Sequence, residues 1–247
     1  MNDNTAIKKN DIFSAEIVST GSGGEGVCRI DNMTVFVPYA VLGDVLDVKI
    51  VKVNKSYAFG KIENISVPSP YRTKAKCSAF GKCGGCDLQT TDYQTQLEIK
   101  RGKVRDALER IGGFKDIDVK PCVPSDPNFG YRNKAQYPVA SIDGKAATGF
   151  YAPRSHRLVI ADECPLTDSD SKTIAKTVID FLNKYKIEAY NEESHKGCVR
   201  HIYTRSGDDE IIAVIVGATK ELKNREILVD MLKNEIGKHT SELQSLG

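Results

Sequence analysis

The sequence predicts an α+β protein of two domains, in which a five-stranded OB-like β-barrel is followed by an α+β domain that holds a four-cysteine site. Residues 12–66 alternate apolar and polar side chains, are dense in valine and isoleucine, and leave no room for a helix. Two prolines within residues 67–71 indicate a linker, so we expect the barrel over residues 1–66 and the second domain over residues 67–247. Beyond the linker, helical and strand patterns mix without regular alternation, as is typical of the α+β class.

The expected barrel strands are short and separated by turn signals. Alternation predicts strands at residues 13–18, 33–37, 45–53 and 58–65. Segments rich in glycine, asparagine and aspartate lie between them, at residues 21–26, 31–32, 43–44 and 54–55. Four or five such strands fit a small closed barrel, and barrels of this kind often bind nucleic acid on one face.

The second domain is expected to contain three helices and two hairpins. The clearest helix spans residues 92–111, where Tyr93, Leu97, Val104, Leu108 and Ile111 recur at helical spacing and the other positions include several basic side chains. Two further helices are predicted at residues 168–185 and 222–236. Hairpins are predicted at residues 131–151, with its turn at Asp143 and Gly144, and at residues 199–217.

Composition places the chain among ordinary globular proteins of the cytoplasm. It has 247 residues, of which 40% are hydrophobic and 28% charged, and a net charge of +2. No apolar run is long enough to span a membrane, and the polar N-terminus does not resemble a secretory signal. Because thiols stay reduced in the cytoplasm, the seven cysteines indicate metal binding or chemistry rather than disulfides.

Basic residues gather around and after the cysteine-rich segment. They outnumber acidic residues in both residues 67–110 and residues 130–157, whereas residues 1–66 are nearly neutral. A phosphate backbone would be attracted to such a region. The alternative is that these charges form an ordinary solvated surface.

Cys77, Cys83 and Cys86 form the strongest local signal in the sequence. Five residues separate the first two, and Gly84 and Gly85 separate the last two. Glycine permits the tight backbone path that several ligands on one loop require, and the loop N–H groups can then point at sulfur.

Cys164 is the best candidate for a fourth ligand because Pro165 follows it, as proline follows the last cysteine of bacterial ferredoxin motifs. The uneven spacing of the four cysteines favours a 4Fe–4S cluster over structural zinc, although zinc remains an alternative, as do four unrelated buried cysteines. The other three, Cys28, Cys122 and Cys198, lie in β-patterned runs and are expected to be small core residues.

These motifs, taken in order, resemble the TRAM-domain RNA uracil-C5 methyltransferases, in particular those that modify 23S ribosomal RNA. That family begins with a five-stranded TRAM barrel, followed by a cysteine loop ending in Cys-Gly-Gly-Cys and by a later fourth cysteine. The resemblance covers essentially the whole chain. The matching segments are residues 76–89, residues 131–136 (Tyr-Arg-Asn-Lys-Ala-Gln), residues 149–151 (Gly-Phe-Tyr), Ser155 with His156, residues 163–166 (Glu-Cys-Pro-Leu), and residues 199–202 with Arg205.

The resemblance implies methylation of carbon 5 of a uridine with S-adenosylmethionine as methyl donor. In the family, a cysteine attacks carbon 6 of the base and a glutamate later removes the proton from carbon 5. Those groups belong to a Rossmann-like domain, and no glycine-rich strand-to-helix turn of that kind occurs in residues 1–247. We therefore expect the chain to lack the catalytic domain and to be inactive alone, and we assign no catalytic residue.

The expected role of the chain is RNA recognition by a monomer, with 23S ribosomal RNA favoured over tRNA and no membrane partner. The candidate RNA-binding residues lie on the predicted hairpins and their turns: Arg132, Lys134, Gln136, His156, Arg157, Arg200 and His201. Arginine and lysine would contact phosphate, and glutamine could read a base edge. Some of these side chains could instead stabilise the domain by hydrogen bonds. The alternative function is a non-enzymatic RNA-binding module with a structural four-cysteine metal site.

Overall fold

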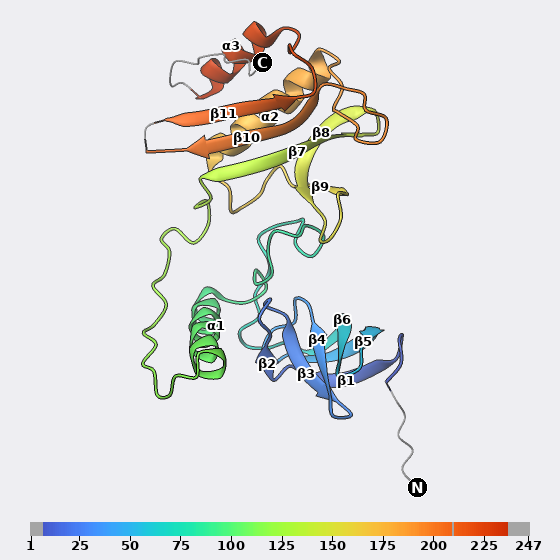
Figure 1. Ribbon diagram of the computed structural model, residues 1–247, viewed down its shortest axis with the longest axis vertical. Coiled ribbons are helices and arrows are strands. Elements are labelled where there is room, and N and C mark those ends of the chain that lie inside the picture. Colours follow the sequence, from blue (N-terminus) through green and yellow to red (C-terminus); the bar gives the residue numbers. More distant parts are fainter. Residues whose placement is uncertain (1–6, 209, 237–247) are drawn as a thin grey trace. The chain divides into compact units, whose positions relative to one another are not determined.

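The computed structural model describes residues 7–208 and 210–236, which fold into two compact units (Figure 1). Of the described residues, unit 1 comprises 7–76 and 86–125, and unit 2 comprises 77–85, 126–208 and 210–236. The units thus divide the chain differently from the expected boundary at residue 66, because residues 86–125 pack with the barrel. That boundary stays a prediction, whereas the α+β class is confirmed.

The barrel of unit 1 is a six-stranded sheet in the order β1-β5-β6-β4-β3-β2. Strands β4 and β6 pair in parallel, and the other pairs are antiparallel. The two-residue strand β2 follows β1 closely, and β3 contains Cys28, which the sequence placed in a β-patterned run. The strands are β1 (Ile12–Glu16), β2 (Ser19–Thr20), β3 (Gly26–Ile30), β4 (Met33–Val37), β5 (Val45–Val53) and β6 (Tyr57–Val67).

Alternate residues of these strands fill the barrel interior. Val35, Leu46, Val48 and Ile50 are fully buried, as the apolar alternation predicted. Cys28 is also fully buried, which confirms its expected place in the core, and burial raises the pKa of its thiol to about 11.

An ion pair fixes the segment that leaves the barrel. The carboxylate of Asp44 is fully buried and accepts hydrogen bonds from the backbone N–H groups of Val41 and Ser69 at 2.6 and 2.9 Å. It also accepts from Nε and Nη2 of Arg72, at 2.9 and 2.5 Å. The residues after β6 are therefore held to the barrel and do not form a free linker.

Helix α1 (Tyr93–Asp106) and the π-helical turn η1 (Ala107–Ile111) together confirm the predicted helix. Asp92 caps the helix by accepting a hydrogen bond from the Thr95 backbone N–H at 3.0 Å. The expected apolar face is only partly buried. Leu97 is buried, whereas Val104 and Ile111 are 52% and 87% exposed.

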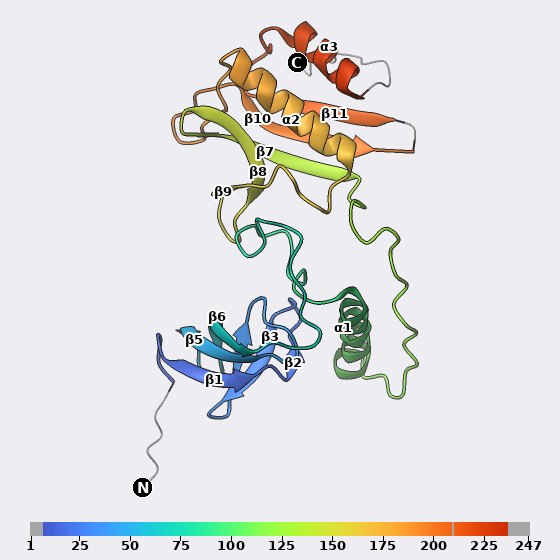
Figure 2. The same ribbon diagram turned by 180° about the vertical axis from the view of Figure 1, so that it is seen from behind.

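Unit 2 is a five-stranded antiparallel sheet in the order β11-β10-β7-β8-β9. Helix α2 crosses one face of this sheet, which Figures 1 and 2 show from opposite sides. The elements are β7 (Lys134–Ile142), β8 (Lys145–Tyr151), β9 (Leu158–Ile160), α2 (Ser169–Lys184), β10 (Val199–Ser206), β11 (Ile211–Gly217) and α3 (Arg225–Ile236).

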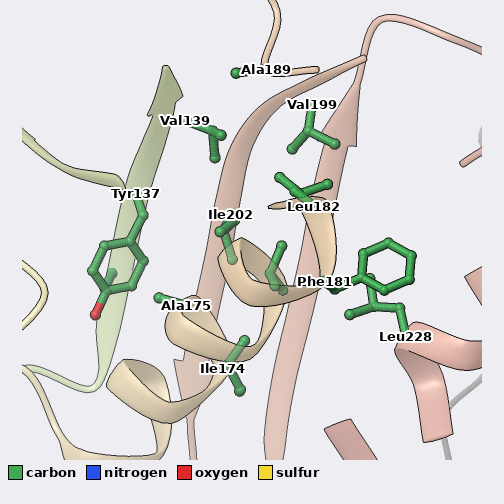
Figure 3. Close-up of a cluster of buried hydrophobic side chains, with 12 residues drawn as sticks. Tyr137, Val139, Ile174, Ala175, Phe181, Leu182, Ala189, Val199, Ile202 and Leu228 are labelled. Atoms are coloured by element: carbon green, nitrogen blue, oxygen red, sulfur yellow. The ribbon is translucent and has the colours of Figure 1, made fainter. Parts of the chain in front are cut away.

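The core of unit 2 lies between the sheet and its helices (Figure 3). Phe181 and Leu182 of α2 are fully buried together with Ile202 of β10, and Tyr137 of β7 is 1% exposed. Leu228 places α3 against the same cluster. The helices therefore anchor β7 and β10 from one side.

Both predicted hairpins of unit 2 are confirmed. Asp143 and Gly144 connect β7 to β8 with φ angles of 51° and 77°, and two positive φ angles are what a type I′ hairpin turn requires. Strands β10 and β11 form the second hairpin. None of the described helices is long and apolar enough to cross a membrane.

Candidate functional site

The cysteine loop of unit 2, residues 77–85, packs against the β8–β9 turn. Within the loop, the backbone N–H groups of Lys82 and Cys83 both donate to the Ala79 carbonyl, at 3.0 and 2.9 Å. Ala79 is buried together with Ala152, which follows β8. The loop is thus anchored by its own turn and by an apolar contact with the sheet.

Gly84 makes the closest approach between this loop and the sheet. Its backbone N–H donates to the carbonyl of Tyr151 at 3.1 Å. A side chain at this position would place Cβ 3.3 Å from the backbone of Pro153, which is tighter than ordinary contact. Glycine at position 84 therefore serves close packing of the loop against the sheet.

Three of the four predicted cysteine ligands interact electrostatically within unit 2. Burial raises the pKa of the Cys83 thiol, and a hydrogen bond from the Gly85 backbone lowers it. Negative charge on Cys77 and Cys164 raises the pKa of Cys83 further, and the positive charge of Arg132 opposes this effect. Cys164 is buried, so these thiols share a partly desolvated neighbourhood.

The fourth predicted ligand, Cys86, belongs to unit 1, where its sulfur accepts a hydrogen bond from Nε2 of Gln89 at 3.1 Å. Across the described part of the chain, no three or more His, Cys, Asp and Glu side chains are grouped so that they could hold a metal ion. The four-cysteine centre therefore stays a prediction.

Cys122 and Cys198 are both partly buried, and Cys198 packs against the core of unit 2. Cys122 was expected in a strand of the core, but it lies in an irregular segment and is only partly buried. Cys198 is likewise partly buried and contacts the Thr219 hydroxyl at 3.0 Å. The expectation of a core position is wrong for Cys122, because a β-patterned run without a pairing partner forms no strand.

Lys134 and Gln136 project from β7 as predicted. Both are exposed, while Ala135 and Tyr137 between and after them are buried against α2. Arg132 lies before the strand and is only partly exposed. Its backbone N–H donates to the Leu166 carbonyl at 2.8 Å. Lys134 and Gln136 thus share one face of the sheet.

Arg200 and His201 begin β10, but their environments differ. The Arg200 guanidinium lies 4.0 Å from the ring centroid of Tyr190 and 3.6 Å from the Glu192 carboxylate. It thus forms a cation–π contact and an ion pair within the chain. Burial lowers the pKa of His201. The negative charge of Glu192 raises this pKa, and the positive charge of Arg200 lowers it further. His201 therefore favours its neutral form near pH 7.

His156 and Arg157 lie in the exposed turn between β8 and β9. The His156 ring is 5.3 Å from the ring of Tyr151. An open depression of about 690 Å³ adjoins these rings, lined by Gly84, Gly85, Phe150, Tyr151, Ala152, Pro153, Arg154, Ser155 and His156.

Two side chains beside the predicted ones were missed. Strand β10 pairs with β7 so that Tyr203 lies opposite Gln136 and Arg205 lies opposite Lys134. Alternation along residues 199–206 would have placed Tyr203 and Arg205 on the same face as His201. The pairing of β10 with β7, which brings them beside Lys134, is not readable from that alternation.

Comparisons with known proteins agree with this architecture. The TRAM domain family model matches residues 9–62. A Clostridium tetani protein described as an uncharacterized RNA methyltransferase is 39% identical over 97% of this chain and 52% of its own length. A protein of Halalkalibacterium halodurans with the same description is 36% identical over 97% of this chain and 53% of its own length.

A solved structure matches both units. The crystal structure of the Pyrococcus abyssi tRNA (uracil-54, C5)-methyltransferase in complex with S-adenosyl-L-homocysteine has a TM-score of 0.62 and 25% identity to this chain. The match covers 87% of this chain and 48% of that protein.

These alignments overturn one expectation, namely that the chain lacks the methyltransferase domain and is inactive alone. Proteins described as RNA methyltransferases align with 97% of the chain, and a methyltransferase solved with S-adenosyl-L-homocysteine aligns with 87% of it. The chain spans about half the length of the curated relatives it matches.

Proposed function

We propose that this chain, which belongs to the TRAM-domain RNA uracil methyltransferase family, binds structured RNA for methylation of uridine at carbon 5 with S-adenosylmethionine as methyl donor. The observation that carries the proposal is the match over 87% of the chain to a tRNA uracil-C5 methyltransferase solved with S-adenosyl-L-homocysteine. Relatives described as RNA methyltransferases support the same reaction class. Such a function belongs to the cytoplasm, and we propose that the protein acts there as a monomer.

The proposed substrate is 23S ribosomal RNA rather than tRNA. The support is the ordered combination of a TRAM domain with the Cys-Gly-Gly-Cys loop, which resembles the ribosomal RNA type of the family. The test is to delete the gene in its own host and to measure 5-methyluridine by mass spectrometry in purified 23S RNA and tRNA. Loss confined to 23S RNA is expected. Loss confined to tRNA would reverse the substrate assignment, and unchanged methylation of both would remove the proposed reaction.

The residues proposed to bind RNA are those of the unit 2 hairpins and their turns. Lys134, Arg157 and Arg132 would contact phosphate oxygens, which position RNA without reading its sequence. Gln136 could hydrogen-bond a base edge, and His156 could stack with the ring of Tyr151 on an unpaired base. Arg200 and His201 complete the set, although Arg200 would first have to leave Tyr190 and Glu192.

Binding across a salt series tests this surface directly. Fluorescence anisotropy of the chain with labelled 23S fragments and with tRNA would give the dissociation constant between about 50 and 200 mM salt. Tight, salt-sensitive binding to the 23S fragments is expected. An absence of binding to either RNA at low salt would contradict an RNA-binding role for the chain.

We also propose a 4Fe–4S cluster held by Cys77, Cys83, Cys86 and Cys164. The cysteine spacing and the electrostatic interaction of three of the thiols support it. No step of RNA methylation is assigned to the cluster. Its role here would be to hold the loop in place.

Anaerobic purification followed by iron, sulfide and zinc analysis tests the cluster. A brown protein with four iron atoms per chain is expected, and Cys164→Ser should lose the colour while Cys198→Ser keeps it. A colourless protein with one zinc per chain would show that the site is a zinc site.

A further inference from the structure

We infer that Lys134 and Arg205 together form a clamp for one RNA phosphate, and that Tyr203 beside them stacks on an unpaired base. The inference rests on the proposed function, because Lys134 belongs to the proposed RNA-binding set. It adds Tyr203 and Arg205 to that set and assigns different roles to the cations and to the ring. The two cations bind the backbone, and the ring binds a base.

The pairing of two cations carries the argument. Lys134 and Arg205 are opposite partners in the antiparallel β7–β10 pair, and both are exposed. Side chains so paired have Cβ atoms about 5 Å apart, and like charges at this spacing destabilise a sheet. An anion bound between Lys134 and Arg205 would relieve the repulsion between their positive charges.

Neither Lys134 nor Arg205 forms an ion pair within the part of the chain that the structure describes, although Lys61, Arg72, Arg101 and other cations do. The nearby β10–β11 turn carries Asp208 and Glu210, and neither pairs with Arg205.

The two cations lie on a face of the sheet that the described helices leave open. Helices α2 and α3 pack on the opposite face, against Tyr137, Ile202 and their neighbours. Figure 1 shows the open face, with β7, β10 and β11 in front of α2. An extended ligand could therefore lie along the strands without displacing a helix.

Aromatic side chains continue this face beside the clamp. Tyr203 is partly exposed, lies opposite Gln136, and is two residues from Arg205, which places the two side chains about 7 Å apart along the strand. The ring of His201 meets the Tyr203 ring edge-on, with centroids 6.2 Å apart. Unpaired bases stack on such rings while cations hold the adjoining phosphate.

RNA fits this face better than a protein partner does. The clamp offers a guanidinium, which binds phosphate through two parallel hydrogen bonds, together with a lysine ammonium. Ile212 and Val214 are exposed on the edge strand β11 and would suit an apolar partner, but they lie beside the cations rather than between them. Single-stranded RNA can use both the cations and the rings.

The test measures binding of the chain to a labelled single-stranded oligoribonucleotide from 50 to 200 mM salt. Lys134→Gln and Arg205→Gln should each weaken binding several-fold. If both cations hold one phosphate, the double variant should lower the salt slope by about 0.7, the value for one contact with a single strand. Lys176→Gln, an exposed lysine of α2 on the opposite side of the sheet, is the matched control and should change neither quantity.

Variants of Tyr203 test the stacking role separately. Tyr203→Phe keeps the ring and should bind normally, whereas Tyr203→Leu keeps an apolar side chain but loses the ring. A loss of roughly fivefold to a hundredfold is expected for Tyr203→Leu, since one stacked base is worth about 1–3 kcal/mol. Circular dichroism of each variant verifies that the fold is retained.

The outcomes distinguish a failure of the clamp or of stacking from a failure of the proposed function. If the chain binds RNA but the Lys134 and Arg205 variants match Lys176→Gln, the clamp is wrong and the proposed function stands. A fall of about 1.4 in the salt slope of the double variant would mean two separate phosphates and would also reject the clamp. Equal binding by Tyr203→Leu and the unaltered chain would reject stacking. An absence of RNA binding by the unaltered chain would reject both the clamp and the proposed function.

Discussion

Replacing Asp44 with asparagine should loosen the barrel of unit 1 more than any comparable change on its surface. The Asp44 carboxylate has no exposed area and accepts four hydrogen bonds, two of them from Arg72. Asparagine has nearly the same shape but turns one acceptor into an N–H donor and leaves Arg72 without its counter-charge. Removing one partner of a buried ion pair costs about 3–5 kcal/mol. Because Arg72 remains partly exposed, we expect about 3 kcal/mol, the lower end of this range.

Hydrogen exchange measured by mass spectrometry on peptides of β5 gives the assay. A loss of about 3 kcal/mol should accelerate exchange of the slowest barrel amides on the order of a hundredfold. Asp47→Asn is the control. It makes the same chemical change on the same strand, where Asp47 accepts a hydrogen bond from Asn64 at 3.1 Å near the surface. This control should cost no more than about 0.5 kcal/mol.

The stabilisation by Asp44 should also depend on pH. Burial alone would raise the pKa of its carboxyl, but hydrogen bonds from Arg72, Ser69 and Val41 and the charge of Arg72 outweigh burial and lower the pKa below its ordinary 3.8. A lowered folded-state pKa means that the contribution is complete above about pH 4 and is lost as the pH falls through the folded value. The difference between the unaltered chain and Asp44→Asn should therefore be constant from pH 5 to 7 and shrink towards pH 3. A difference below about 1 kcal/mol at pH 7, or one that grows on acidification, would refute the reasoning.

A substitution in unit 2 and a labelling experiment in unit 1 test how the two units are packed. Gly149→Ala should destabilise unit 2 by about 2 kcal/mol or more, because an added Cβ would overlap the Val159 carbonyl oxygen across the β8–β9 pair. Thermal unfolding followed by circular dichroism measures this loss, and an unchanged melting temperature would show that β9 is not held as described. Cys28, buried and with its thiol pKa raised to about 11, should react with a thiol reagent only after unfolding. Mass spectrometry of the labelled peptides checks this, and rapid labelling in the folded chain would contradict the barrel core.

Local chemistry explains why parts of the fold could be predicted from sequence. The turn at Asp143 and Gly144 was predictable because both residues tolerate the positive φ angles that a tight hairpin needs. The helix after Asp92 was predictable from the periodicity of its apolar residues, and the structure adds the Asp92 cap as a second local signal. Both signals lie within a few residues of the element that they specify.

The features that could not be predicted depend on partners far away in the chain. Periodicity gave α1 an apolar stripe, but Val104 and Ile111 are exposed, because a pattern reports a face and not what covers it. Strand alternation likewise could place Lys134 and Arg205 each on a face, yet their opposition depends on the β7–β10 register. The pairing of Lys134 with Arg205, on which the proposed phosphate clamp depends, therefore could not be predicted from the sequence.

The structure also changes the weight of the argument for a cluster in the cysteine loop. The two glycines between Cys83 and Cys86 favoured a metal because ligands on one loop need a flexible backbone. Gly84 now has a second explanation, since its close approach to the Pro153 backbone leaves little room for a side chain. The glycine spacing is therefore weaker support for a metal than the sequence indicated. The support that remains is proximity. Cys77 and Cys164, 87 residues apart in sequence, both lie close enough to Cys83 to affect the pKa of its thiol.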